Sequence, residues 1–144
     1  MGDDRGWPLA DVVFGGVASV SDLWNLTQQL LEASRALDAA LDELRSQTTA
    51  WASAERGYRH AKAVAYLRSE GRNVQERESN AEAVMFPAGT LGDVRFARDQ
   101  SEGLRTAALE AVRSRRAQLS AIQTLASLSK AEAEFARVGP DRGP

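Results

Sequence analysis

The chain has 144 residues, of which 43% are hydrophobic and 26% are charged, and its net charge at pH 7 is −2. This length fits one domain, and the hydrophobic fraction is high enough for the chain to fold. The sequence contains no cysteine, which excludes disulfides, thiolate zinc sites and cysteine nucleophiles.

The N-terminus is acidic and is followed by Pro8, whereas a secretory signal needs a basic start and a long apolar run. No apolar stretch approaches the ~20 residues that are needed to span a bilayer. We therefore expect no membrane association and a cytoplasmic location.

Residues 1–20 are predicted to form an N-terminal arm. Its apolar residues follow a helical spacing from Leu9 to Val20, but Gly15 and Gly16 interrupt the pattern. Two interpretations stay open. The arm either packs on the rest of its own chain or docks into a neighbouring subunit or partner.

A seven-residue apolar repeat marks the next segment, in which Ser21 is expected to be the N-cap of a helix. Its first row is Leu23, Leu30, Leu37, Leu44, Trp51, Tyr58 and Ala65, and its second row is Leu26, Ala33, Ala40, Ala54 and Ala61. This spacing is that of a helix which buries one face against another helix. The repeat predicts one long helix that continues through Gly57 to about Gly71.

Short-range signals divide the rest of the chain. Asn73 is expected to cap a short helix that ends near Met85, and Thr90 to cap a second long helix. The Gly139-Pro140 pair stops this helix and leaves a flexible tail over 139–144. The buried face of the second long helix is predicted to consist of Val94, Ala97, Leu104, Ala108, Val112, Leu119, Ile122 and Ala126. Leu125, Leu128 and Phe135 are predicted to broaden this face near the end of the helix.

These elements predict an all-α fold, a long antiparallel helical hairpin (a coiled coil) with a short connecting helix, over residues 21–138. A turn near residue 80 would place Trp51 close to Leu109. Two helices bury only one stripe each, so we expect the hairpin to self-associate into a helical bundle. The predicted oligomer or partner interface consists of Trp24, Leu30, Leu31, Leu37, Leu41, Leu44, Leu109, Leu125 and Leu128.

Charge is distributed unevenly along the chain. Residues 1–50 carry a net charge of −5, whereas residues 51–72 carry +3 and residues 91–116 carry +2. In a hairpin the two basic segments lie side by side, and arginines with interleaved aromatic rings are typical of single-strand binding. A solvated helix surface and an acidic protein partner are the alternatives. The candidate nucleic-acid contacts are Arg56, Arg59, Lys62, Arg68, Arg72, Arg95 and Arg98.

Signals for catalysis are weak. His60 is the only histidine, and one histidine without cysteine cannot build a typical zinc site. Glu76, Glu78 and Glu82 share the short connecting segment, where a solvated helix surface explains them. No nucleophile elbow or phosphate-binding glycine motif occurs. We predict a non-enzymatic protein with no catalytic, cofactor-binding or metal-ligating residue.

Three segments carry a resemblance to a known group of proteins. Residues 58–67 read YRHAKAVAYL, residues 74–82 read VQERESNAE, and residues 113–125 read RSRRAQLSAIQTL. This arrangement resembles small coiled-coil proteins of tailed bacteriophages and prophages, which are often encoded among DNA replication and recombination genes. The resemblance covers residues 50–128. It implies a phage setting, hence the cytoplasm of a bacterial host, and a helical hairpin, and it transfers no catalytic residue.

We therefore carry three functional hypotheses forward. The first is a phage-type assembly or adaptor protein that acts through helix–helix and protein–protein contacts, as a homo-oligomer. The second is a nucleic-acid-binding accessory factor in phage recombination or replication that uses the basic half of the hairpin. The third is a structural component of the virion.

Overall fold

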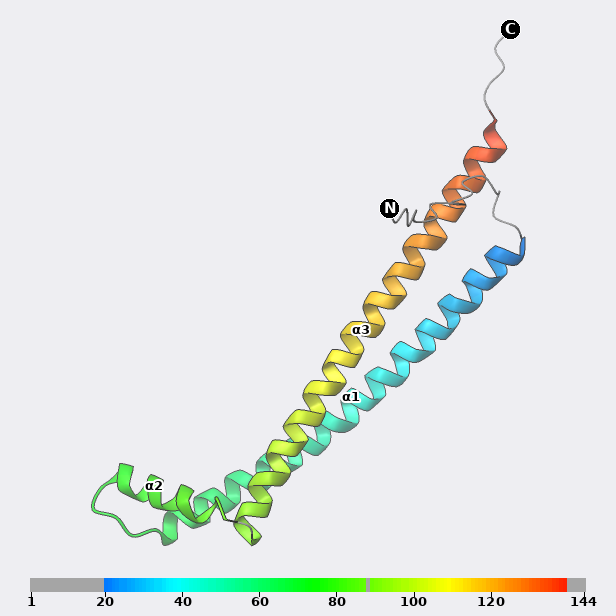
Figure 1. The fold of residues 1–144 in the computed structure, drawn as a ribbon. Helices are drawn as coiled ribbons and strands as arrows, with labels where there is room; N and C mark the ends of the chain where they lie inside the picture. Colours follow the sequence, from blue (N-terminus) through cyan, green and yellow to red (C-terminus); the bar gives the residue numbers. More distant parts are fainter. Residues whose placement is uncertain (1–19, 88, 140–144) are drawn as a thin grey trace, which may run out of the picture. The chain divides into compact units, whose positions relative to one another are not determined.

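The computed structural model of the protein describes residues 20–87 and 89–139, and over these residues it consists of helices without strands (Figure 1). The two long helices are α1 (Val20–Arg68) and α3 (Thr90–Val138), with 49 residues each, and the short helix between them is α2 (Val74–Val84), with 11. The predicted all-α hairpin with a connecting helix is confirmed. Residues 1–19 of the predicted arm and 140–144 of the predicted tail lie outside the described residues.

The chain divides into two compact units, and each is described by itself. The central unit is Glu32–Leu119, in which α1 and α3 run antiparallel and α2 connects them. The terminal unit combines Met1–Leu31 with Ser120–Pro144, of which residues 20–31 and 120–139 are described.

The heptad repeat of α1 defines its buried side. Each first-row residue from Leu30 to Tyr58 is half-buried and Ala65 is buried, whereas Leu23, near the start of the helix, is 43% exposed. The helix continues through Gly57, as predicted. Its first described residue is Val20, so Ser21 lies inside the helix rather than at its cap.

Side chains of α2 and of its N-cap residue form hydrogen bonds with the backbone around the loop that precedes the helix. The carboxamide oxygen of Asn73 accepts a hydrogen bond from the Glu76 amide at 2.8 Å, which confirms Asn73 as the cap. The Glu76 carboxylate in turn accepts from the Arg72 amide at 2.8 Å. The Asn80 amide group donates to the Glu70 carbonyl at 2.8 Å. These bonds satisfy backbone groups that the turn leaves without helical partners.

The start of α3 depends on two glycines. Gly89, rather than Thr90, precedes the helix, with a φ of +137° that L side chains rarely adopt. Its amide donates to the Asp93 carboxylate at 3.4 Å, and its carbonyl accepts from the Asp93 amide at 2.7 Å. A Cβ on Gly92 would lie 1.8 Å from the carbonyl oxygen of Pro87. The chain can therefore approach the helix this closely only with glycine at position 92.

The best-buried residues lie where α2 meets the long helices. Ala65, Ala81 and Met85 form a small core against which partly buried residues of α1 and α3 pack, namely Tyr58, Ala61, Tyr66 and Leu91. Among the described residues, only Ala108 and Val112 are buried besides these three. The hairpin thus has a narrow core and depends on its helix–helix seam.

The buried side of α3 differs from the prediction. Ala97 is exposed and Leu104 is 49% exposed, whereas Arg98, Ser101 and Arg105 are half-buried. The reason is a heptad row of α3 in which arginine occupies two positions that normally carry apolar residues. This row is Leu91, Arg98, Arg105, Val112 and Leu119.

Candidate interaction surfaces

Two arginines of α3 pack on two aromatic rings of α1. The guanidinium carbon of Arg98 lies 4.5 Å from the centre of the Tyr58 ring, and that of Arg105 lies 4.8 Å from the Trp51 ring. Both arginines and both rings are seven residues apart, so the contacts form two successive layers of the seam. Arg105 thus occupies the place against Trp51 that we predicted for Leu109, about one helical turn away.

Acidic side chains surround the first of these layers. The Arg98 side chain is only 23% exposed, and its nitrogens lie 3.0 Å from Asp99, 3.5 Å from Glu102 and 3.9 Å from Glu55. The Arg98 Nε atom is buried and has no hydrogen-bond partner among the described residues. An arginine stacked on a ring and surrounded by carboxylates is a structural residue. It is not free to bind a phosphate.

Three further predicted nucleic-acid contacts are also paired. The Arg59 Nε lies 2.7 Å from Glu55, and the Lys62 Nζ lies 3.1 Å from Glu82 of α2. The hydrogen bond to Glu82 raises the pKa of Lys62. The Arg95 guanidinium lies 4.1 Å from the centre of the Phe86 ring.

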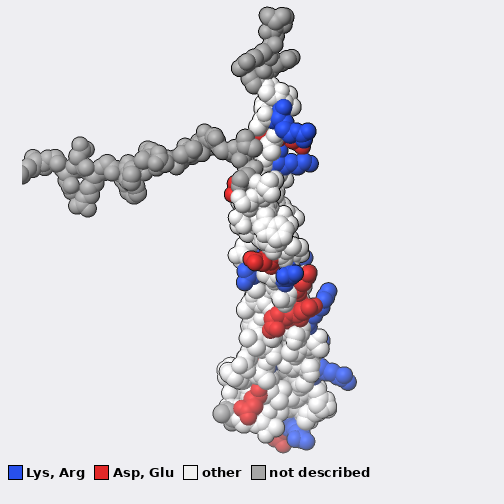
Figure 2. Space-filling view, turned by 90° about the vertical axis from the view of Figure 1, so that its right-hand side faces the viewer, with Lys and Arg blue, Asp and Glu red and all other residues white. Residues whose placement is uncertain are grey.

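The remaining three predicted contacts are available. Arg56, Arg68 and Arg72 are exposed, and no carboxylate of the described chain lies within ion-pair distance of their guanidinium groups. Figure 2 shows one side of the molecule, on which charged residues form small groups separated by uncharged surface. Because Arg98, Arg59, Lys62 and Arg95 are occupied by contacts within the chain, the seven basic residues do not form one open patch.

The predicted interface residues separate into two groups. Four of them are half-buried along α1 and therefore pack within the hairpin, namely Leu30, Leu37, Leu41 and Leu44. The other residues are exposed. Their exposed fractions are 64% for Trp24, 46% for Leu31, 36% for Leu109, 54% for Leu125 and 57% for Leu128.

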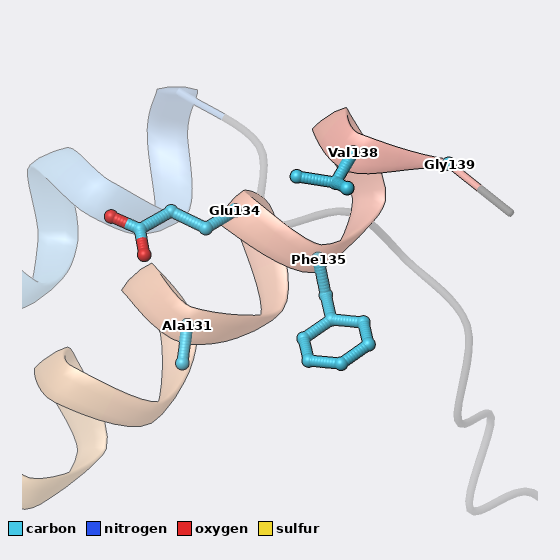
Figure 3. A pocket seen from close by; sticks show the side chains of 5 residues that line it. All are labelled: Ala131, Glu134, Phe135, Val138 and Gly139. Carbon is cyan, nitrogen blue, oxygen red and sulfur yellow. The ribbon is translucent and has the colours of Figure 1, made fainter. Parts of the chain in front are cut away.

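The terminal unit exposes further large apolar residues at the end of α3. Phe135 is 86% exposed and Val138 is 83% exposed, and neither was included in the predicted interface. Together with Ala131, Glu134 and Gly139 they line an open hollow of about 600 Å³ (Figure 3). The predicted buried face of α3 included Leu125, Leu128 and Phe135, but all three side chains are exposed, so this part of the prediction is wrong.

No protein family, curated protein or solved structure matches the chain. The phage-type family therefore stays a prediction. No helix among the described residues is both long and apolar enough to cross a membrane. The same residues contain no group of three histidine or acidic side chains placed to hold a metal ion.

Proposed function

We propose that this chain is a non-enzymatic assembly protein that self-associates into a helical bundle through apolar side chains of its terminal unit. The exposed side chains of Leu125, Leu128 and Phe135, which share one side of α3, support this function most strongly. Large apolar side chains that gather on an exposed surface are typical of interaction sites. The resemblance of residues 50–128 to phage coiled-coil proteins supports a setting in a bacterial host.

The test compares two neighbouring exposed positions of α3. Leu128→Asp places a charge among the exposed apolar residues, whereas Ser127→Asp places the same charge on the adjacent residue. Sedimentation velocity of the full chain should show an oligomer for wild type and for Ser127→Asp, and a smaller species for Leu128→Asp. A wild-type chain that stays monomeric at every concentration would contradict the proposal.

A second candidate function is nucleic-acid binding, which the free guanidinium groups of Arg56, Arg68 and Arg72 favour. Phosphate contacts release counterions, so binding should weaken steeply as salt increases. Fluorescence anisotropy of labelled single- and double-stranded DNA across a salt series tests it. Arg68→Ala with Arg72→Ala should weaken binding with the helices intact. Binding that is independent of salt would exclude this role.

A further inference from the structure

The central unit has two unlike flanks beside its seam. In the heptad register of α1, one side of the seam carries Glu55, Lys62 and Tyr66. Glu55 and Lys62 form ion pairs with Arg98 and Glu82, and Tyr66 packs on the small core beside α2. Between positions 36–57 of α1 and 97–118 of α3 this side, the charged flank, carries Asp38, Arg45, Glu55, Asp99, Glu102, Arg113 and Arg116.

The opposite side, the uncharged flank, carries one charged residue over the same length. Its residues are Ala36, Ala39, Glu43, Ser46, Ala50, Ser53 and Gly57 on α1, and Ala97, Gln100, Leu104, Ala107, Ala111, Ser114 and Gln118 on α3. All except Ala36, which is half-buried, are exposed, and Leu104 is exposed by 49%. The Glu43 carboxylate is occupied by the Gln47 amide group at 2.7 Å. The chain has 26% charged residues, but few of them lie on this flank. Removing the uncharged flank from water therefore costs less free energy than removing the charged flank.

We infer that the uncharged flank of the central unit is the surface on which a second copy of this chain packs. The inference rests on the self-association proposed above and specifies which flank of the central unit it uses. A two-fold interface places the same surface on both partners, so the surface must be complementary to itself.

The side chains of this flank select a second copy as the occupant. Alanine, serine and glycine allow helix axes to approach closely, but only when the facing helices also carry small residues, because large side chains hold the axes apart. A copy of the same flank supplies such residues on both of its helices. The packing of charged flanks would instead remove about seven charged groups per copy from water.

The area of the flank also fits a stable dimer. Two adjacent helices of 22 residues each form a surface of about 33 by 20 Å, or on the order of 650 Å² in plain projection. A standard protein interface buries about 800 Å² of accessible surface per partner.

Ala50 and Ala52 provide a matched pair for the test. Both are exposed alanines of α1, but Ala50 lies on the uncharged flank and Ala52 on the charged flank. Ala50→Glu in both copies would place like charges in the interface, which should raise the dimer dissociation constant about a hundredfold. Ala52→Glu should leave it unchanged. Sedimentation velocity of the full chain gives both values, and far-UV circular dichroism checks that the helices persist.

Each outcome supports or overturns the inference. If Ala50→Glu associates as tightly as wild type while Leu128→Asp does not, the inference fails and the proposed function stands. If the wild-type chain is monomeric, both fail. If Ala50→Glu loses helicity, Ala111→Glu on α3 decides in its place, with Thr106→Glu on the charged flank as its control.

Discussion

The guanidinium group of Arg98 on α3 lies over the ring of Tyr58 on α1, with its central carbon 4.5 Å from the ring centre. A cation above an aromatic face is attracted by the negative potential of the ring, and more strongly where water is partly excluded. Seven residues later, Arg105 makes the same contact with Trp51 at 4.8 Å. Two layers of the same kind, each with an arginine on an aromatic ring, distinguish this register from one that is shifted by a helical turn. Simple Leu/Ala layers would distinguish the registers less well.

Replacing Arg98 tests whether this layer stabilises the hairpin. Arg98→Leu removes the ring contact and leaves Glu55 with one cation fewer, and it should lower the free energy of unfolding by about 1–2 kcal/mol. Arg116→Leu, at an exposed position of the same helix, should change it by about 0.5 kcal/mol or less. Urea unfolding followed by circular dichroism measures both. A double-mutant cycle with Tyr58→Leu should give a coupling of about 0.5–1 kcal/mol, and no coupling would show that the ring contact is unimportant.

Alanine substitutions at Gly92 and Gly103 of α3 should change the free energy of unfolding in opposite directions. Gly92→Ala would bring its Cβ to 1.8 Å from the Pro87 carbonyl oxygen, so the connection between α2 and α3 must move. We expect a loss of about 2 kcal/mol or more in unfolding free energy. Gly103 has open space around it, and Gly103→Ala should raise stability by about 0.5–1 kcal/mol, because alanine is the better helix former. Thermal unfolding of the two variants measures both signs, and equal effects would contradict the close approach at Gly92.

The Asn73 cap should contribute measurably to α2. Asn73→Ala removes the 2.8 Å hydrogen bond to the Glu76 amide and should cost about 1 kcal/mol. Asn73→Asp retains an acceptor and should be nearly neutral. Hydrogen exchange of the α2 amides localises the effect. Faster exchange throughout α1 and α3 in Asn73→Ala would show instead that the cap supports the whole hairpin.

An acid in the seam should act differently from an acid outside it. Leu37 is half-buried in the α1 seam, so Leu37→Asp should lower helicity and stability, by about 2 kcal/mol or more. Leu125 is 54% exposed on α3, so Leu125→Asp should retain the helicity and weaken self-association. Circular dichroism and sedimentation velocity separate the two effects. If Leu37→Asp retained its helicity, the α1 seam would be wrong.

Much of the fold was predictable because its signals are local. The heptad row of α1 depends only on spacing along one helix, and Asn73 caps a helix through a hydrogen bond to a residue three positions away. The prediction was less accurate at Thr90, because the distinction between Thr90 and Gly89 depends on a backbone angle. It was wrong for Ala97 and Leu104, because apolar residues do not mark the buried side of a helix that buries arginine.

The helices, the hairpin and the α1 seam follow from sequence patterns, since periodicity and capping act over a few residues. Which basic residues are free depends on contacts between helices. An arginine is structural or available according to what faces it from another helix, as Tyr58 faces Arg98 and Glu82 faces Lys62. The same holds for the register, since placing Arg105 rather than Leu109 against Trp51 depends on contacts between residues more than fifty positions apart.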